Sequence, residues 1–455
     1  MSPISHSGDT HIDVEFTDQH VSFSDQIDEP IQANVPLLLQ RSYARSRSSI
    51  FDELRNFRIS LKWWALDHSS CMGKFISYLT FTIFTIFIPA VASFAVRVPA
   101  TALADDPISL NKLVQLPASG LAVIGFFTLS RFFRRYGLRQ LLFLDDLQDD
   151  SMHIRRGYTG ELDKAFRYLA CILLPSFFVE LAHKIIFFST VTTSIPYVNP
   201  KNIVPINSVL FVLVLASWVY RTGVFLLVCV LFRSTCELQL LRFEGLRKML
   251  EGCGSDSGVI FEEHLRIRKQ LSVTSHRYRF FIIACLVTIT VSQLGALLLV
   301  LTSKSEKNFF NSGDLVVCSA VEISGFFLCL MGAARITHRA QGIVSVATRW
   351  HMLVTCASTS STCGPPPDRP KGQNMWTPTS KYSDSDSDSP QTFITICSQH
   401  PSCFRTRQAL VAYLEHNNGG ITLFGFALDR GLLHTLFAFE FSLVLWILSK
   451  VVVLS

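Results

Sequence analysis

The sequence lacks the short motifs on which the common enzyme classes depend. It contains no HExxH, no GxSxG and no glycine-rich phosphate loop, and these absences argue against zinc proteases, serine hydrolases and P-loop enzymes. It also lacks an aromatic and basic groove or a recognition motif for nucleic acid, so the net charge of +6 has another cause. We therefore predict no catalytic residue, no cofactor and no nucleic-acid partner.

The N-terminus lacks a secretory signal, and the chain is rich in apolar residues. The first residues, MSPISHSGDTHIDVEF, have neither the charged start nor the short apolar core of a signal peptide. The first membrane span is expected to act as the signal instead. Apolar residues make up 49% of the chain, and its 37 phenylalanines exceed what a soluble domain usually carries. This composition predicts a membrane protein.

Seven apolar segments are long enough to cross a bilayer, which takes roughly 20 mostly apolar residues. They cover about 75–95, 113–131, 168–191, 204–232, 280–301, 315–335 and 421–454. The last is too long for one simple crossing. Its first third is interrupted by Gly425, Asp429, Arg430 and Gly431, so we expect it to split near 429–431. The predicted fold class is an all-α membrane protein with seven transmembrane helices.

Lysine and arginine concentrate on one side of these spans. The connections before 75, at 131–167, at 233–279 and at 335–407 hold 32 of them, whereas the other connections hold five. By the positive-inside rule the side with 32 is cytosolic. The topology therefore has a cytosolic N-terminus and an extracellular C-terminus, the reverse of a G-protein-coupled receptor. The basic loops are suited to the anionic lipids of the inner leaflet.

The cysteines follow the same division. None of the twelve lies in a predicted external loop, so no structural disulfide is expected. Cys397, His400 and Cys403 have a spacing that a metal ion can use, but we prefer to interpret them as part of a reduced, flexible loop. No metal site is predicted.

Composition also divides the chain into regions of different kinds. Polar tracts with few bulky apolar side chains predict disorder, and an apolar stripe with tryptophans predicts a helix at the membrane surface. In order, the regions are a disordered cytosolic tail (1–50), an interfacial amphipathic helix (51–66), transmembrane helices one to six with cytosolic helical extensions (67–335), a cytosolic connection (336–420) with a disordered insertion at about 357–392, and the last helix (421–455).

Apolar stripes at helical spacing continue past the inner ends of several spans. One runs from Leu240 to Leu250, a second helix leads from about 259 to 279 into the fifth span, and a third runs from Arg335 past Trp350. Such stripes are most easily buried against one another. We expect a cytosolic helical anchor bundle.

Serines alternate with aspartates in the predicted insertion. Two interpretations stay open: phosphorylation by an acidophilic kinase, which would add charge to an already negative tract, or a solvated linker without regulation. The candidate phosphorylation sites are Ser383, Ser385, Ser387 and Ser389.

Ionisable residues within the spans are costly and are candidates for a functional site. In the third span Glu180, His183 and Lys184 lie three and four residues apart, on one helical face. One interpretation pairs Glu180 with Lys184 or Arg221 to fix helix packing. The other has Glu180, His183 and Lys184 line a ligand pocket open to the outside. Further ionisable residues in the spans are Glu322, Asp429, Arg430, His434 and Glu440.

Two segments resemble a known family. GFALDRGLLHTLFAFEFSLVLWILSK (425–450) resembles the C-terminal signature of insect gustatory receptors, and AQGIVSVATRWHMLVTCAS (340–358) resembles plant gustatory-receptor-like proteins. The resemblance implies a seven-transmembrane ion channel of the insect gustatory and odorant receptor superfamily, with a cytosolic anchor domain and a tetramer around the last helix.

The resemblance also assigns residues of the last helix. Those that match the motif at its start are Gly425, Phe426, Asp429 and Arg430. The second half of the motif matches poorly, because the glutamine that faces the insect pore falls on Ser449, beside Trp446 and Lys450. These three are the pore-lining candidates. A lysine ring disfavours cations, so either conduction is not cation-selective, or Lys450 extends to the outer headgroups and Trp446 sets a hydrophobic constriction. We prefer the second.

The predicted function is a ligand-gated ion channel in the plasma membrane. The resemblance implies a homotetramer with a pore lined by the last helix, and the expected partners are membrane lipids and a small-molecule ligand of unknown identity. The alternative is a non-conducting membrane receptor or scaffold. A transporter is less favoured, because the sequence shows one interrupted helix and an odd number of spans instead of repeats with paired broken helices.

Overall fold

The computed structural model describes residues 61–62, 64, 66, 71–95, 107–143, 152–190, 203–251, 256–302, 309–360, 402–417 and 419–453. All of them belong to one compact unit, Ser49–Ser455. The predicted tail (1–50), most of the predicted interfacial helix and the part of the insertion beyond 360, with its candidate phosphorylation sites, lie outside the described residues.

Helices account for nearly all of the described chain. In order they are α2 (Cys71–Thr82), the π-helical η1 (Ile83–Phe87), α3 (Ile88–Ala95), α4 (Pro107–Arg135), α5 (Gly137–Leu141), α6 (Met152–Thr190), α7 (Ile203–Glu251), α8 (Ser257–Thr302), α9 (Phe309–Ser360), α10 (Ser402–His416) and α11 (Arg430–Val453). Seven helical stretches of the described residues are long and apolar enough to cross a membrane. The prediction of an all-α protein with seven membrane spans is confirmed.

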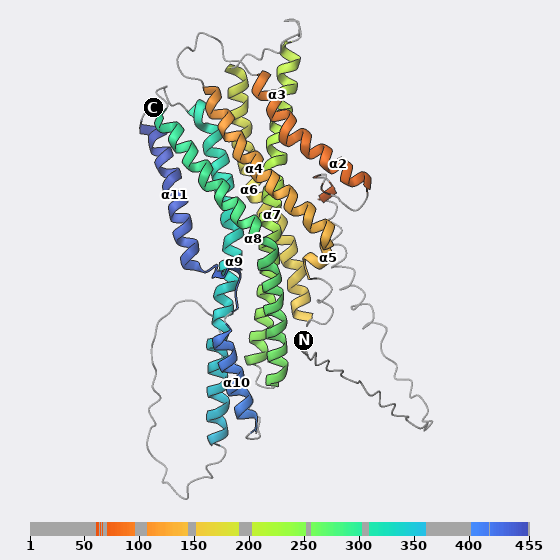
Figure 1. Cartoon of the computed structure of the whole chain (residues 1–455), viewed down its shortest axis with the longest axis vertical. Coiled ribbons are helices and arrows are strands. Elements are labelled where there is room, and N and C mark those ends of the chain that lie inside the picture. Colours follow the sequence, from red (N-terminus) through yellow and green to blue (C-terminus); the bar gives the residue numbers. More distant parts are fainter. Residues whose placement is uncertain are drawn as a thin grey trace, which may run out of the picture. The chain divides into compact units, whose positions relative to one another are not determined.

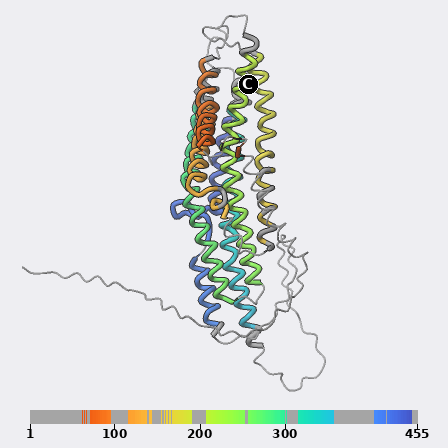
Figure 2. Tube along the Cα trace, turned by 90° about the vertical axis from the view of Figure 1, so that its right-hand side faces the viewer, coloured from red at the N-terminus to blue at the C-terminus, as the bar shows by residue number. Residues whose placement is uncertain are grey.

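Three helices are far longer than a membrane requires. The longest, α9, has 52 residues and at 1.5 Å per residue is about 78 Å long, whereas the hydrocarbon core of a bilayer is about 30 Å thick. α7 and α8 have 49 and 46 residues. α10 packs against α9 and α8, and α7 packs against both of these helices (Figures 1 and 2). This is the helical bundle that the continuing apolar stripes predict.

The centre of the membrane part is α7, which packs against α4, α6, α8 and α9. From Val224 to Phe232 each of its side chains is buried. A helix that is apolar on all sides must be surrounded by other helices, so this run determines where its neighbours lie. Of the predicted interfacial helix, Leu61 and Leu66 are buried in the same core, and the Trp64 ring lies 6.4 Å from that of Tyr220.

The first residues of the last predicted span, which begins at about 421, do not form a helix. Residues 422–427 form a hairpin of β1 (Thr422–Leu423) and β2 (Phe426–Ala427), and α11 begins only at Arg430. Phe424 and Gly425 have φ angles of 50° and 94°, and two successive positive φ angles are those of a tight hairpin turn. The glycine that interrupts the apolar run therefore ends the helical pattern there.

Candidate functional site

Two polar side chains from different helices are buried together within the membrane spans. Arg221 on α7 donates from Nη1 to Ser119 Oγ at 2.9 Å and to the Gln115 carbonyl at 3.4 Å, both on α4. Its Nε donates to the Ser217 carbonyl at 3.4 Å. The guanidinium therefore joins α4 to α7 through groups that an apolar side chain could not engage.

Glu322 on α9 lies across the same region and is only 5% exposed. Its Oε1 is buried and has no hydrogen-bond partner among the residues that the structure describes. A buried carboxylate oxygen without a partner is costly in a medium of low dielectric constant. Buried polar groups normally have hydrogen-bond partners, and exceptions to this rule are expected mainly at functional sites.

Glu322 and Cys318 border two small cavities between α4, α7, α8 and α9. The residues that line the first are Ala118, Leu121, Arg221, Thr222, Phe225, Cys318, Val321 and Glu322. Those that line the second are Pro117, Ser292, Ala296, Leu315, Cys318, Ser319 and Glu322. Each cavity measures about 10 Å³, room for about one water molecule. We name the two together the Glu322 cavities.

The lining of the Glu322 cavities combines apolar side chains with a few polar groups. Most of the lining is apolar, and a cation and a carboxylate converge on the first cavity, the combination that orients ligands in proteins. Sites for drug-sized ligands measure about 300–1,000 Å³. A ligand of that size therefore requires α4, α7 and α9 to separate or their side chains to change rotamer.

The residues predicted for a ligand pocket on α6 lie elsewhere. Glu180, His183 and Lys184 are buried, and Lys184 Nζ lies 3.5 Å from Glu180 Oε1 and 5.6 Å from the centre of the Phe187 ring. The structure thus brings Glu180 and Lys184 together as an ion pair on one helix. None of the three lines the Glu322 cavities.

The motif at the start of the last helix forms a turn and a helix cap. Gly425 supplies the positive φ of the hairpin, and Asp429 Oδ1 accepts a hydrogen bond from the backbone N–H of Leu432 at 2.8 Å. A carboxylate in this position satisfies an N–H group that the first helical turn leaves free. Phe426 and Arg430 are exposed. The turn at Gly425 and the cap at Asp429 thus mark the position at which α11 begins.

α11 has two different faces. Its buried stripe, which packs on α8 and α9, consists of Leu433, Phe437, Glu440, Leu443 and Ile447. Two of the pore candidates, Trp446 (48% exposed) and the exposed Ser449, project from the opposite face together with Ser442. The side chain of Lys450 lies outside the described residues.

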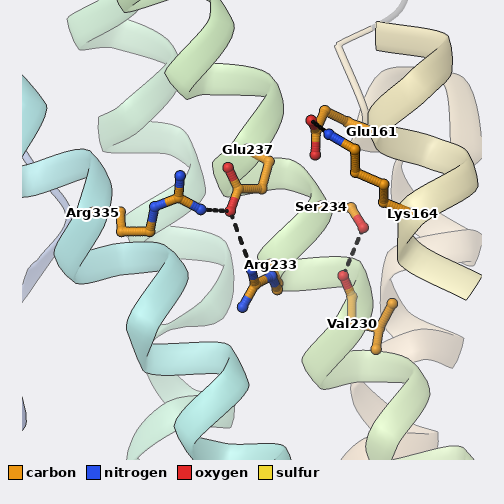
Figure 3. Close-up of polar contacts among 7 residues, drawn as sticks. All are labelled: Glu161, Lys164, Val230, Arg233, Ser234, Glu237 and Arg335. Atoms are coloured by element: carbon orange, nitrogen blue, oxygen red, sulfur yellow. Dashed lines mark hydrogen bonds and ion pairs between the residues drawn. The ribbon is translucent and has the colours of Figure 1, made fainter. Parts of the chain in front are cut away.

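A charge cluster joins α7 and α9 (Figure 3). Its residues were not among the site candidates predicted from the sequence. Arg335 Nη1 donates to Glu237 Oε1 at 2.5 Å, and Arg233 Nη2 lies 3.5 Å from the same oxygen. The Arg233 guanidinium also lies 4.2 Å from the centre of the Tyr168 ring on α6. Three helices are thus held together where the apolar spans end. The signal in the sequence was the Arg233 and Glu237 pair, one helical turn apart.

Solved structures with a similar overall fold come from an insect olfactory receptor. The insect olfactory receptor OR5 from Machilis hrabei in complex with eugenol matches with a TM-score of 0.54 and 11% identity, over 84% of this chain and 91% of that one. A second structure of the same receptor, whose description names no ligand, matches with a TM-score of 0.50 and 10% identity. This match covers 83% of this chain and 89% of the receptor chain. At such identities the likeness shows the fold alone.

The sequence itself matches a family over most of its length. No curated protein matches the chain. Residues 52–439, from the predicted interfacial helix to the middle of α11, match the family described as "Protein of unknown function (DUF3537)". The chain is an integral membrane protein with the fold of an insect odorant receptor, and it belongs to the DUF3537 family.

Proposed function

We propose that this protein is the subunit of a ligand-gated ion channel in the plasma membrane, a homotetramer whose pore is lined by α11. The observation that carries the proposal is the division of α11 into a buried stripe and an outward face with Ser442, Trp446 and Ser449. Ser442 Oγ donates to the Phe439 carbonyl of its own helix at 2.7 Å, but the oxygens of the two serine hydroxyls can still accept hydrogen bonds and are better placed against water or another helix than against lipid. Four copies that place this face on a common axis give such surroundings.

The ligand site of this channel is the pair of Glu322 cavities. A small, mostly apolar molecule with a hydroxyl or amine group suits them, because its polar group supplies the donor that Glu322 Oε1 lacks and its body packs against Leu121, Phe225 and Val321. The fold likeness supports the choice, since the structure of the Machilis receptor is of a complex with a small molecule.

The gate is a constriction at Trp446, and Lys450 extends toward the outer headgroups. A bulky aromatic ring at a narrow point excludes water and therefore ions. Replacing Trp446 with alanine widens that point without altering the buried stripe. The consequence is a channel that conducts without ligand.

Potassium flux from liposomes that contain the purified protein tests this, with the oligomeric state measured by native mass spectrometry in nanodiscs. We expect a tetramer whose ligand-free flux rises about tenfold or more in Trp446→Ala. The matched control is Phe441→Ala, because Phe441 is 50% exposed on the same helix but projects about 140° away around it. Equal flux from both variants contradicts the pore assignment.

A non-conducting receptor or scaffold is the second candidate. The observation in its favour is the poor match of Ser449 and Lys450 to the pore half of the insect motif. A stable monomer, or a tetramer without flux in Trp446→Ala, supports this candidate and excludes the channel. Binding of a panel of small phenols and amines, measured by thermal shift and lost in Glu322→Leu, then separates a receptor from a scaffold.

A further inference from the structure

Glu440 stands in the buried stripe of α11, where an apolar residue would be expected. It is 1% exposed, and its neighbours along the stripe are Phe437 and Leu443. An ionisable side chain in a membrane span is costly to bury and needs a compensating role. The contacts of Glu440 with α8 show what that role can be.

One oxygen of Glu440 is hydrogen-bonded and the other is not. Thr290 Oγ1 on α8 donates to Glu440 Oε1 at 2.5 Å, whereas Glu440 Oε2 is buried without a hydrogen-bond partner in the described part of the chain. Gln293 lies one helical turn further along α8 and is fully buried. Neither its Oε1 nor its Nε2 has a hydrogen-bond partner among the described residues. A buried amide donor on α8 and a buried carboxylate oxygen on α11 are therefore both unsatisfied among the described residues, and the amide lies one helical turn from the Thr290 that already binds this carboxylate.

The next turn of the same interface is apolar and touches the ligand site. Ala296 and Leu297 of α8, Leu315 of α9, and Leu443 and Ile447 of α11 form one buried cluster. Ala296 and Leu315 also line the second of the Glu322 cavities. The second cavity and α11 therefore share a wall, and an expansion of this cavity toward Ala296 and Leu315 displaces residues that pack with α11.

We propose that Glu440, Thr290 and Gln293 form a two-position joint that transmits ligand binding at the Glu322 cavities to α11. The proposal rests on the proposed function. In the position seen here Glu440 accepts from Thr290. In the second position it accepts from the Gln293 amide, about 4.5 Å further along α8 at 1.5 Å per residue. Packed helices switch between discrete arrangements of this kind instead of deforming continuously.

The two positions give opposite expectations for two conservative variants. Thr290→Val keeps the shape but removes the donor of the first position, so it favours the second. Gln293→Leu removes the donor of the second position, so it favours the first. A purely structural role would have no reason to separate the two variants by sign. The matched control is Thr288→Val, because the Thr288 hydroxyl donates only within its own helix, to the Ala284 carbonyl at 2.8 Å.

The experiment is ¹⁹F NMR of the full chain labelled with 5-fluorotryptophan in nanodiscs, without ligand. Trp446 lies on α11 about two turns beyond Glu440, and its signal among the six tryptophans is assigned with Trp446→Phe. We expect two Trp446 resonances whose population ratio shifts about fivefold in opposite directions in the two variants, the effect of one net hydrogen bond. Thr288→Val leaves the ratio unchanged.

One resonance in every variant, or shifts in the same direction, overturns the joint. The measurement needs neither ligand nor conduction, so it separates this inference from the proposed function. Opposite population shifts in a protein without ion flux support the joint and reject the channel. Flux that is opened by Trp446→Ala, in a protein whose Trp446 ratio is indifferent to Thr290→Val and Gln293→Leu, supports the channel and rejects the joint.

Discussion

Two glutamines on α8 show how strongly the surroundings decide the value of one polar side chain. Gln270 Oε1 accepts a hydrogen bond from the buried Arg242 guanidinium, which also donates to the Phe143 carbonyl at 3.4 Å. Gln293 is just as buried, but both of its amide atoms lack a hydrogen-bond partner within the described residues. The first glutamine satisfies a charge, and the second carries an uncompensated desolvation cost.

The same substitution at these two positions is therefore expected to change stability with opposite sign. Gln293→Leu replaces an unsatisfied amide with an apolar group of similar size and raises the free energy of unfolding by about 1 kcal/mol. Gln270→Leu leaves a buried guanidinium with fewer partners and lowers it by about 1.5–3 kcal/mol. Thermal unfolding in nanodiscs measures both. A loss of stability in both variants would show that Gln293 has a partner that holds it in place.

At the scale of the element, close approach of α7 and α9 depends on a residue without a side chain. A Cβ added at Gly332 of α9 would lie 3.2 Å from Cys236 Cβ and 3.4 Å from the Arg233 Cα, and the second of these is backbone that cannot rotate away. Small residues allow membrane helices to approach in this way. Arg335, one turn further, then reaches Glu237. The charge cluster of Figure 3 thus depends on a glycine contact.

A side chain added at Gly332 is expected to push α7 and α9 apart. Gly332→Val forces side chain against backbone and lowers the free energy of unfolding by about 1–3 kcal/mol, the usual cost of overpacking. Gly342→Val is the matched control, because Gly342 lies on the same helix with nothing within 4 Å of an added Cβ. Hydrogen exchange of the α7 and α9 amides is expected to rise near the charge cluster in the first variant only. Equal protection in both would contradict the close contact.

At the scale of the whole molecule, the spans were predictable, and so were Arg221 and Glu322 as single candidate residues, but their meeting at one cavity was not. A membrane span is a local property, since about 20 apolar residues in succession suffice, and the stripes beyond the spans follow from helical spacing. Arg221 and Glu322, by contrast, stand about a hundred residues apart, and neither has a neighbour in the sequence that indicates the other. Only the packing of α7 against α9 brings them to one cavity.

The α6 residues illustrate the opposite case. Helical spacing places Glu180 and Lys184 on one face of α6, and the structure shows that they form an ion pair. Local spacing, however, says nothing of which cavity a helix face lines. The hairpin at 422–427 was also missed: the break in the last apolar segment was expected near 429–431, and no strand was expected before it. Its positive φ angles depend on a turn that hydrophobic periodicity does not record.

The orientation of the whole molecule follows from charge alone and can be tested alone. With 32 basic residues on one side and five on the other, the α8–α9 connection faces outward and the α7–α8 connection faces the cytosol. A glycosylation acceptor carried in a flexible insert after Thr302 is expected to be modified in microsomes, and the same insert after Glu251 is not. Modification of only the insert after Glu251 would show that the topology is the reverse of the predicted one. The extended ends of α7, α8 and α9 would then lie outside, and α11 would enter the membrane from the opposite face. In the expected orientation these helices instead form a cytosolic bundle, and α11, which begins at Arg430, crosses the membrane from the cytosolic face outward.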